Sequence, residues 1–302
     1  MNILVTVDSN YVRPLKVMLT SFFVHHKNEN KIYLLYSNVK DSELDELQQL
    51  IENHGSLFFP VRIEESTLSG VPVIRYFTKE MYYRLLAGMV FPEEKRMLYL
   101  DPDILIRDSV VPLYETDLEG MVMAGIADVA VNTMLSDHKR ELGFQDEEQY
   151  LNSGVLLIDL EKLRECFSLE DIKKIVEEKG EFLRYPDQDI INLVFRGKMK
   201  VMERKYNYST GYGNGIGMLR YMAGGFVKER RYPVIVHFMG PTKPWHPAYY
   251  GKFGREYRRY LKEYPDQDPN AKKEWKKRHI AIGKHLFKVM IRKIGGTDHE
   301  KK

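Results

Sequence analysis

The segment Tyr99–Asp108, YLDPDILIRD, places two aspartates one residue apart at the end of an apolar stretch. On an extended chain, side chains two positions apart point the same way, so the Asp101 and Asp103 carboxylates would face one side. Two like charges held together are unfavourable unless a cation lies between them. Oxygen ligands suit a hard cation such as Mn²⁺ or Mg²⁺, which in turn neutralises a diphosphate. A surface turn in which Asp103 caps a backbone amide explains the same residues without a metal.

A second group of polar residues follows the short apolar strand predicted at Val234–Val236. His237 ends this strand, and the loop Gly240–His246, GPTKPWH, is stiffened by two prolines. Gly240 permits close backbone approach, and Lys243 offers a point charge suited to phosphate. A single histidine is usually structural. Together, however, the carboxylate pair, His237 and Lys243 predict a site for a metal ion and a diphosphate.

Three further motifs have a structural and a functional interpretation. The run Asp8-Ser9-Asn10-Tyr11 either makes a turn and helix cap or recognises a base and ribose, with Tyr11 stacking. The run Asp187-Gln188-Asp189 precedes an apolar stretch, and its simplest interpretation is a helix N-cap. Asn207-Tyr208-Ser209 matches a glycosylation acceptor pattern, which we interpret as chance because the first residues do not resemble a secretory leader.

The elements around these residues alternate between strand and helix. Apolar runs predict strands at 3–7, 31–36, 57–63, 97–100, 121–126, 155–160 and 234–236. Helical patterns follow at 14–26, from 41 onward, at 78–90 and after 187. Near-continuous apolar strands are typical of a mostly parallel sheet flanked by helices on both faces, which is an α/β fold. Ligands bind such sheets at the carboxyl ends of the strands, where Asp8 and Asp101 both lie.

The composition is that of an ordinary globular protein, with 43% hydrophobic and 29% charged residues. The single cysteine, Cys166, excludes a disulfide framework and is consistent with a reducing compartment. No apolar run approaches the about 20 residues of a membrane span. These features predict a cytoplasmic protein.

The charge is unevenly distributed. Residues 271–302, the basic tail, hold eleven Lys and Arg against three acidic residues, a net +8, which leaves −5 for residues 1–270 in a chain of net +3. From Trp275 to Ile294 the apolar and basic residues segregate to opposite sides of a helix. Such a helix would either pack on the body or contact anionic lipid on the inner face of the cytoplasmic membrane. The acidic body and the lack of a recognised module argue against nucleic acid as a partner.

Five ordered segments resemble the retaining family 8 glycosyltransferases, which include bacterial lipooligosaccharide galactosyltransferases and general-stress glycosyltransferase-like proteins. The segments are VTVDSNY, YLDPDILI, YLNSGVLLIDL, YPDQDI and HFMGPTKPWH. The resemblance implies a GT-A type nucleotide-diphospho-sugar transferase domain at 1–250, followed by a basic, aromatic, helical extension at 251–302. It also implies transfer of glucose or galactose from a UDP-sugar to a saccharide, a lipid-linked saccharide or another hydroxyl acceptor, as in lipopolysaccharide biosynthesis.

The resemblance further implies roles for individual residues. Asp101, Asp103 and His237 would hold Mn²⁺, with Mg²⁺ as the alternative, against the diphosphate. The other implied donor contacts are Thr6; Asp8, Asn10 and Tyr11 at the uridine; Gly240 and Lys243 at the diphosphate; and Arg84, Asn152, Asp187 and Gln188 at the sugar. Arg84, Asp187 and Gln188 would be catalytic, with Gln188 nearest the anomeric carbon. Asp128 matches an acidic position lining the sugar and acceptor pocket.

The implied mechanism uses the metal and Lys243 to stabilise charge on the departing UDP. Because glutamine is a poor nucleophile, we favour attack by the acceptor on the same face over a covalent intermediate. Retaining glycosidases instead use two carboxylates. The alternatives are a non-catalytic sugar-nucleotide-binding protein and a DxD metal-dependent phosphohydrolase. Aspartate-nucleophile phosphatases have a small hydroxyl residue soon after the second aspartate, whereas Ile104–Ile106 is apolar.

Overall fold

The computed structural model describes residues 1–64, 67, 79–210, 232–240, 243–246, 249 and 251–264. By compactness the chain divides into two units, Met1–Met239 and Gly240–Lys302. The basic tail lies outside the described residues, so its helix stays a prediction, as does the functional division at residue 250. No helix among the described residues is long and apolar enough to cross a membrane.

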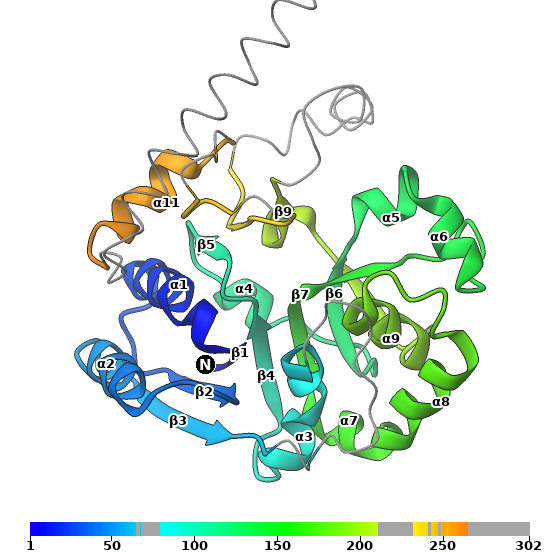
Figure 1. The fold of residues 1–302 in the computed structure, drawn as a ribbon, viewed down its shortest axis with the longest axis horizontal. Coiled ribbons are helices and arrows are strands. Elements are labelled where there is room, and N and C mark those ends of the chain that lie inside the picture. Colours follow the sequence, from blue (N-terminus) through cyan, green and yellow to red (C-terminus); the bar gives the residue numbers. More distant parts are fainter. Residues whose placement is uncertain are drawn as a thin grey trace, which may run out of the picture. The chain divides into compact units, whose positions relative to one another are not determined.

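A seven-stranded sheet runs through the first unit (Figure 1). In spatial order its strands are β3 (Leu57–Arg62), β2 (Lys31–Tyr36), β1 (Asn2–Val7), β4 (Arg96–Leu100), β7 (Leu151–Asp159), β6 (Met123–Ala127) and β8 (Met199–Met202). Among these strands β7 alone runs antiparallel to its neighbours, β4 and β6. The predicted α/β class with a mostly parallel central sheet is therefore confirmed.

Helices cover both faces of this sheet. In chain order the described helices of the first unit are η1 (Ser9–Tyr11), α1 (Val12–His25), α2 (Asp41–Glu52), η3 (Lys79–Leu86), α3 (Ala87–Val90), α4 (Val111–Tyr114), α5 (Val129–Thr133), α6 (Ser136–Glu141), α7 (Leu160–Cys166), α8 (Leu169–Lys179), α9 (Pro186–Val194) and η4 (Arg204–Tyr206). The second unit contains α11 (Gly254–Leu261). The predicted helix at 78–90 is thus mostly 3₁₀ in geometry.

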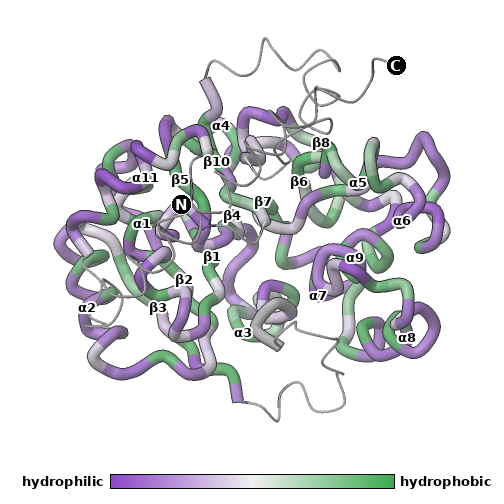
Figure 2. Tube along the Cα trace, turned by 45° about the horizontal axis from the view of Figure 1, so that its top comes forward, coloured by the Kyte–Doolittle hydropathy of each residue, from purple (hydrophilic) through white to green (hydrophobic). Residues whose placement is uncertain are grey.

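Two hydrophobic clusters form because successive side chains of a strand point to opposite faces. Ile3 and Val5 of β1 pack in the cluster that includes α1, α2 and α4. Leu4, between them, packs in the cluster that includes α7, α8 and α9. Figure 1 shows α1 and α2 on one side of the strands and α8 and α9 on the other. In Figure 2 the hydrophobic colour gathers in the central strands, whereas α2, which buries only Leu47 and Ile51, is largely hydrophilic.

A small second sheet joins three distant segments: β5 (Ile104–Ile106), β10 (Ile235–His237) and β9 (Tyr208–Ser209). The chain turns at Asp101–Asp103 and leaves the large sheet. The two carboxylates do face one side, but a turn brings them together and not the extended backbone assumed from their spacing. β10 runs antiparallel to β5 and pairs His237 with Ile104. This register places His237 opposite the residue that follows Asp103.

Two local expectations also differ from the structure. Asn152, Ser153 and Gly154 lie inside β7 rather than before it. The run Asp187–Asp189 lies inside the first turn of α9, whose N-cap is Tyr185, so the N-cap interpretation is wrong. The helix begins earlier because Pro186 fits its first position, where no backbone donor is needed.

Candidate active site

The site residues converge because strand ends converge. β1 and β4 are parallel neighbours, so Asp8 and Asp101, which follow them, lie at the same edge of the sheet. β7 runs the opposite way and begins at this edge, and the backbone N–H of Asp101 donates to the Gly154 carbonyl at 2.8 Å. β6 ends at this edge and leads into Asp128.

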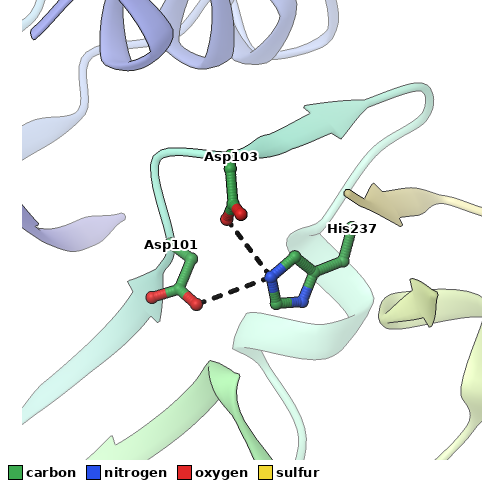
Figure 3. A group of neighbouring side chains, drawn as sticks. All are labelled: Asp101, Asp103 and His237. Carbon is green, nitrogen blue, oxygen red and sulfur yellow. Dashed lines mark ion pairs between the residues drawn. The ribbon is translucent and has the colours of Figure 1, made fainter. Parts of the chain in front are cut away.

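Asp101, Asp103 and His237 form the centre of the site (Figure 3). Their potential metal-ligating atoms all lie within 4.8 Å of one another. His237 Nε2 is 3.5 Å from Asp101 Oδ2 and 3.2 Å from Asp103 Oδ1. Asp103 and His237 are buried, whereas the Asp101 side chain is 20% exposed. A ligand can therefore reach the group at Asp101.

The donor set fits a divalent cation. Carboxylate oxygens suit hard divalent ions, and an imidazole is a ligand of transition-metal ions. The residue beside the group, Gly154, has no side chain. A Cβ at this position would lie 2.3 Å from His237 Cε1 and 2.5 Å from Asp101 Oδ2. Any side chain at residue 154 would displace two of the three ligands. The group thus requires glycine at this position.

Arg84 links the metal group to α9. Its Nη1 lies 3.5 Å from Asp101 Oδ1 and donates to the Ser153 carbonyl at 2.6 Å, while Nη2 lies 3.3 Å from Asp187 Oδ2. The guanidinium also lies over the Tyr99 ring, 4.2 Å from its centroid. Burial opposes the charge of Arg84, but Tyr99 and the carboxylates outweigh burial and raise its pKa. Arg84 is therefore a fixed cation between two carboxylates.

Asp187 is buried at the N-terminal end of α9. Ser153 Oγ donates to Asp187 Oδ2 at 2.9 Å, in addition to the contact with Arg84. Burial nevertheless raises the pKa of Asp187, with Arg84 only partly offsetting it. The carboxylate is thus held in place at an energetic cost to its ionised form.

Tyr99 positions Asp101 from the interior of β4. Its hydroxyl donates to Asp101 Oδ1 at 2.6 Å and lies 3.1 Å from Thr6 Oγ1. Because the Tyr99 proton goes to the carboxylate, the Thr6 hydroxyl must donate to Tyr99. Thr6 therefore lies behind Asp101 in the site, and whether it contacts the donor stays a prediction.

A buried network joins Asp128, Asn152 and Gln188. Gln188 Nε2 donates to Asp128 Oδ2 at 3.2 Å, and Gln188 Oε1 accepts from Asn152 Nδ2 at 2.7 Å and from the Ser153 backbone N–H at 3.2 Å. Asp128 Oδ1 caps α5 by accepting from the N–H groups of Ala130 and Val131. The sequence-predicted residues Asp128, Asn152 and Gln188 are therefore in mutual contact, and their orientations are fixed.

The remaining predicted residues are more peripheral. Asp8 accepts from the Asn10 backbone N–H at 2.9 Å and from Asn10 Nδ2 at 3.1 Å, so this segment does make the helix cap that its residues favour. Asn10 is exposed and Tyr11 half-buried, and their contacts with a uridine stay a prediction. Gly240, with φ +93°, and Lys243 belong to the second unit, and their role at the diphosphate stays a prediction.

Sequence reasoning missed four residues of the site: Tyr99, Ser153, Gly154 and Asn207. From the sequence, Tyr99 is predicted only as a residue of an apolar strand, and Asn207 only as part of a glycosylation pattern. Asn207 is buried, and its amide contacts both His237 and Asn152. The sequence feature that could have pointed to Ser153 and Gly154 is the small, polar Asn-Ser-Gly run beside an otherwise apolar strand.

Sequence comparison establishes the family. The sequence model of glycosyl transferase family 8 matches residues 2–248, so the chain belongs to this family. The lipopolysaccharide 1,2-glucosyltransferase of Escherichia coli K12 is 26% identical, with 96% of this chain and 88% of the relative covered. General stress protein A of Bacillus subtilis is 25% identical over 86% and 93% of the two chains, and the lipopolysaccharide 1,3-galactosyltransferase of Salmonella typhimurium is 24% identical over 81% and 73%.

Solved structures confirm the GT-A fold. Galactosyltransferase LgtC, crystallised with donor and acceptor sugar analogs, has a TM-score of 0.78 at 25% identity, covering 89% of this chain and 99% of that one. GlyE of Streptococcus pneumoniae has a TM-score of 0.68 at 20% identity, covering 91% and 63%, and supports the fold alone. The chain is thus a family 8 glycosyltransferase with a candidate divalent-metal site, which implies a nucleotide-sugar donor and a saccharide acceptor.

Proposed function

We propose that this protein transfers a hexose, glucose or galactose, from a UDP-sugar to a saccharide or lipid-linked saccharide, retaining the anomeric configuration. The observation that supports this most strongly is the juxtaposition of Asp101, Asp103 and His237 with Arg84, Asp187 and Gln188 at one edge of the sheet. Mn²⁺ is the proposed ion, because the imidazole ligand favours it over Mg²⁺. When bound, the ion would neutralise the diphosphate and act as a Lewis acid for the departing UDP.

Each group of residues has a distinct task in this proposal. Asp101, Asp103 and His237 hold the ion, while Gly240 and Lys243 bind the diphosphate. Arg84, Asn152 and Asp187 orient the sugar. Asp8, Asn10 and Tyr11 bind the uridine at the end of β1, beside Thr6. Asp128 lies where the sugar meets the acceptor. Burial of Asp187, Gln188 and Asn152 preorganises these contacts before the donor binds.

The contacts of Gln188 argue for front-face attack. A nucleophilic glutamine would have to attack through Oε1, yet this atom already accepts hydrogen bonds from Asn152 and from the Ser153 backbone. The amide is moreover fixed at its nitrogen by Asp128. We therefore assign Gln188 to electrostatic stabilisation of the sugar as positive charge develops on it, through its dipole and its position. The acceptor hydroxyl then attacks the anomeric carbon on the face from which UDP departs. The new glycosidic C–O bond replaces the C–O bond to the diphosphate, and the hydroxyl proton passes to the departing diphosphate.

The relatives include both a glucosyl- and a galactosyltransferase of lipopolysaccharide, which supports glucose or galactose as the sugar and a saccharide as the acceptor. A lipid-linked acceptor would explain the basic tail, whose net +8 would favour anionic lipid at the cytoplasmic face of the membrane. Substituting Lys284, Lys288 and Arg292 by glutamate in the full chain tests this idea. Cosedimentation with anionic liposomes should fall, and unchanged cosedimentation would refute the membrane contact.

The decisive experiment measures UDP release from UDP-glucose and UDP-galactose, with Mn²⁺, with Mg²⁺ and with a chelator, in the presence of candidate saccharide acceptors. Metal-dependent release with one of the two donors is expected. Donor binding without turnover would instead indicate a sugar-nucleotide-binding protein. If no UDP-sugar is bound or turned over, the proposal fails.

A further inference from the structure

A chain of hydrogen bonds leads from two backbone amides to His237, and its donor–acceptor order can be deduced one step at a time. The backbone N–H of Gly154 donates to Asn152 at 3.0 Å, and a backbone N–H can only donate. The Asn152 atom that receives this bond is therefore the carbonyl oxygen, Oδ1. Its other end, Nδ2, donates to Gln188 Oε1, which also accepts from the Ser153 backbone N–H. The Asn152 amide is thereby fixed at both ends.

Asn207 takes its orientation from Asn152. Since Asn152 Oδ1 can only accept, the Asn207 atom at 2.7 Å from it must be the nitrogen, Nδ2. The Asn207 carbonyl oxygen therefore faces His237 Nδ1, at 2.9 Å. An oxygen that only accepts requires a proton on Nδ1. Nε2 is then the ring nitrogen directed at Asp101 and Asp103.

We infer that Asn207 is a positioning residue for the metal site, which holds a proton on His237 Nδ1 and so directs the lone pair of Nε2 to the cation. This inference rests on the proposed function for its metal, and it adds Asn207, a residue to which the proposed function gives no role. Ligating histidines depend on such outer hydrogen bonds for ring orientation and basicity, and their loss typically costs about 10- to 100-fold in metal affinity. The same chain connects the metal ligand, through Asn207 and Asn152, to Gln188.

The position of Asn207 makes it suited to this role. It directly follows η4 and precedes β9, which pairs in parallel with β10 and aligns Ser209 with His237. Its backbone N–H donates to the Arg204 carbonyl at 3.1 Å, and its side chain is buried. The backbone of Asn207 is therefore held in place, and its side-chain amide has two fixed hydrogen-bond partners. The Asn207 amide thus sets the orientation of the His237 ring.

The direct test is nitrogen-15 NMR of labelled histidine in the metal-free full chain, at a pH where the imidazole is neutral. His237 is assigned by comparison with His237→Gln. We expect a proton on Nδ1 in the wild type and its transfer to Nε2, beside the carboxylates, in Asn207→Leu. A wild-type His237 protonated at Nε2 alone would overturn the inference. This readout needs no sugar transfer, so it separates the inference from the proposed function.

Metal affinity supplies the second test, with Mn²⁺ titrated in the presence of UDP and followed by electron paramagnetic resonance. Asn207→Leu should weaken Mn²⁺ binding by about 10- to 100-fold. Asn207→Asp keeps the acceptor for Nδ1 but loses the donor to Asn152, so it should bind Mn²⁺ near the wild-type level while turning over more slowly. Asn30, another buried asparagine, bonds the Asn28 carbonyl at the opposite end of the sheet. Asn30→Leu should leave Mn²⁺ affinity unchanged, and equal losses in both leucine variants would refute the assignment.

Discussion

Arg84 pairs with Asp187 across the site, Nη2 to Oδ2 at 3.3 Å, with both side chains less than a tenth exposed. One guanidinium also reaches Asp101 and the Ser153 carbonyl, so Arg84 connects the metal ligands to the helix that contains Gln188. The planar guanidinium of arginine has several N–H donors in fixed directions and can contact all three partners at once, whereas the ammonium group of lysine cannot. The geometry of the proposed sugar site therefore depends on this one residue.

Arg84→Lys should retain the charge but lose the simultaneous contacts. We expect turnover to fall by about 100-fold, the effect of a small misplacement of catalytic groups. Arg84→Gln, which leaves Asp187 buried without its cation, should also lower the free energy of unfolding by about 3–5 kcal/mol. Kinetics with the preferred donor and urea denaturation measure the two effects.

Mn²⁺ affinity is the internal control for Arg84. Because a positive charge beside Asp101 opposes cation binding, Mn²⁺ affinity should not fall in Arg84→Gln. A large loss of metal binding would mean that Arg84 shapes the metal site itself rather than connecting it to the sugar.

Gly154 is a second position at which we expect substitution to disrupt the site. In Gly154→Ala the new methyl group would overlap His237 and Asp101. Metal-dependent UDP binding should therefore weaken by at least about 100-fold, which is the largest loss typical when a residue that supports a metal ligand is mutated. Gly88→Ala is a matched control in α3, where the nearest atom, Arg164 Cγ, lies 3.2 Å away and belongs to a flexible side chain. Calorimetric titration of UDP with and without Mn²⁺ should separate the two variants. Normal binding in Gly154→Ala would show that the ligand group is placed differently.

Asp103→Ala tests the metal assignment directly. The variant should lose metal-dependent UDP binding while its circular dichroism stays that of the wild type, because the turn at Asp101–Asp103 is also held by the Phe238 N–H bonding the Asp103 backbone carbonyl at 3.0 Å. Residual binding of UDP without metal should be unaffected. Should the variant bind UDP and Mn²⁺ as tightly as the wild type, Asp103 is not a ligand.

The sequence predicted those parts of the site that follow from strand direction. Asp8 and Asp101 were placed together because parallel strands end at one edge of a sheet. The small polar residues Asn152–Gly154 interrupt the apolar run, so the sequence predicts a strand that begins only at residue 155. The antiparallel direction of β7, which brings this segment to Asp101, cannot be read from the run. The turn that moves β5 into a second sheet, and so brings His237 to Asp103, depends on long-range pairing that no local pattern encodes.

The contacts that fix the ligands were harder still to predict. Tyr99 is an ordinary residue for a buried strand, and only the folded structure shows its hydroxyl between Thr6 and Asp101. Asn207, between η4 and β9, acquires its role from Asn152, which lies in β7 of the large sheet. Such roles arise from tertiary contact, so residue type and spacing alone do not reveal them.

Asp187 should make stability depend on pH in a direction opposite to that of a typical surface carboxylate. Burial raises its pKa above the ordinary value of 3.8, so the folded protein holds the proton more tightly than the unfolded chain does. The resulting stabilisation is complete below pH 3.8 and is lost as the pH rises through the raised pKa. Asp187→Asn, which cannot ionise, should therefore equal the wild type in acid and be more stable at neutral pH.

The same substitution should reduce turnover by about 100-fold, since the amide no longer offers a charge to Arg84 and the sugar. Urea denaturation of both proteins across the pH range measures the difference in unfolding free energy. Asp189→Asn is the matched control two residues along α9: its carboxylate accepts from the N–H groups of Arg184 and Tyr185 at 2.8 and 2.9 Å, so the amide should destabilise the fold at neutral pH. If Asp187→Asn proves less stable than the wild type at neutral pH, the pairing with Arg84 outweighs burial, and Asp187 is then a structural anchor rather than a strained functional group.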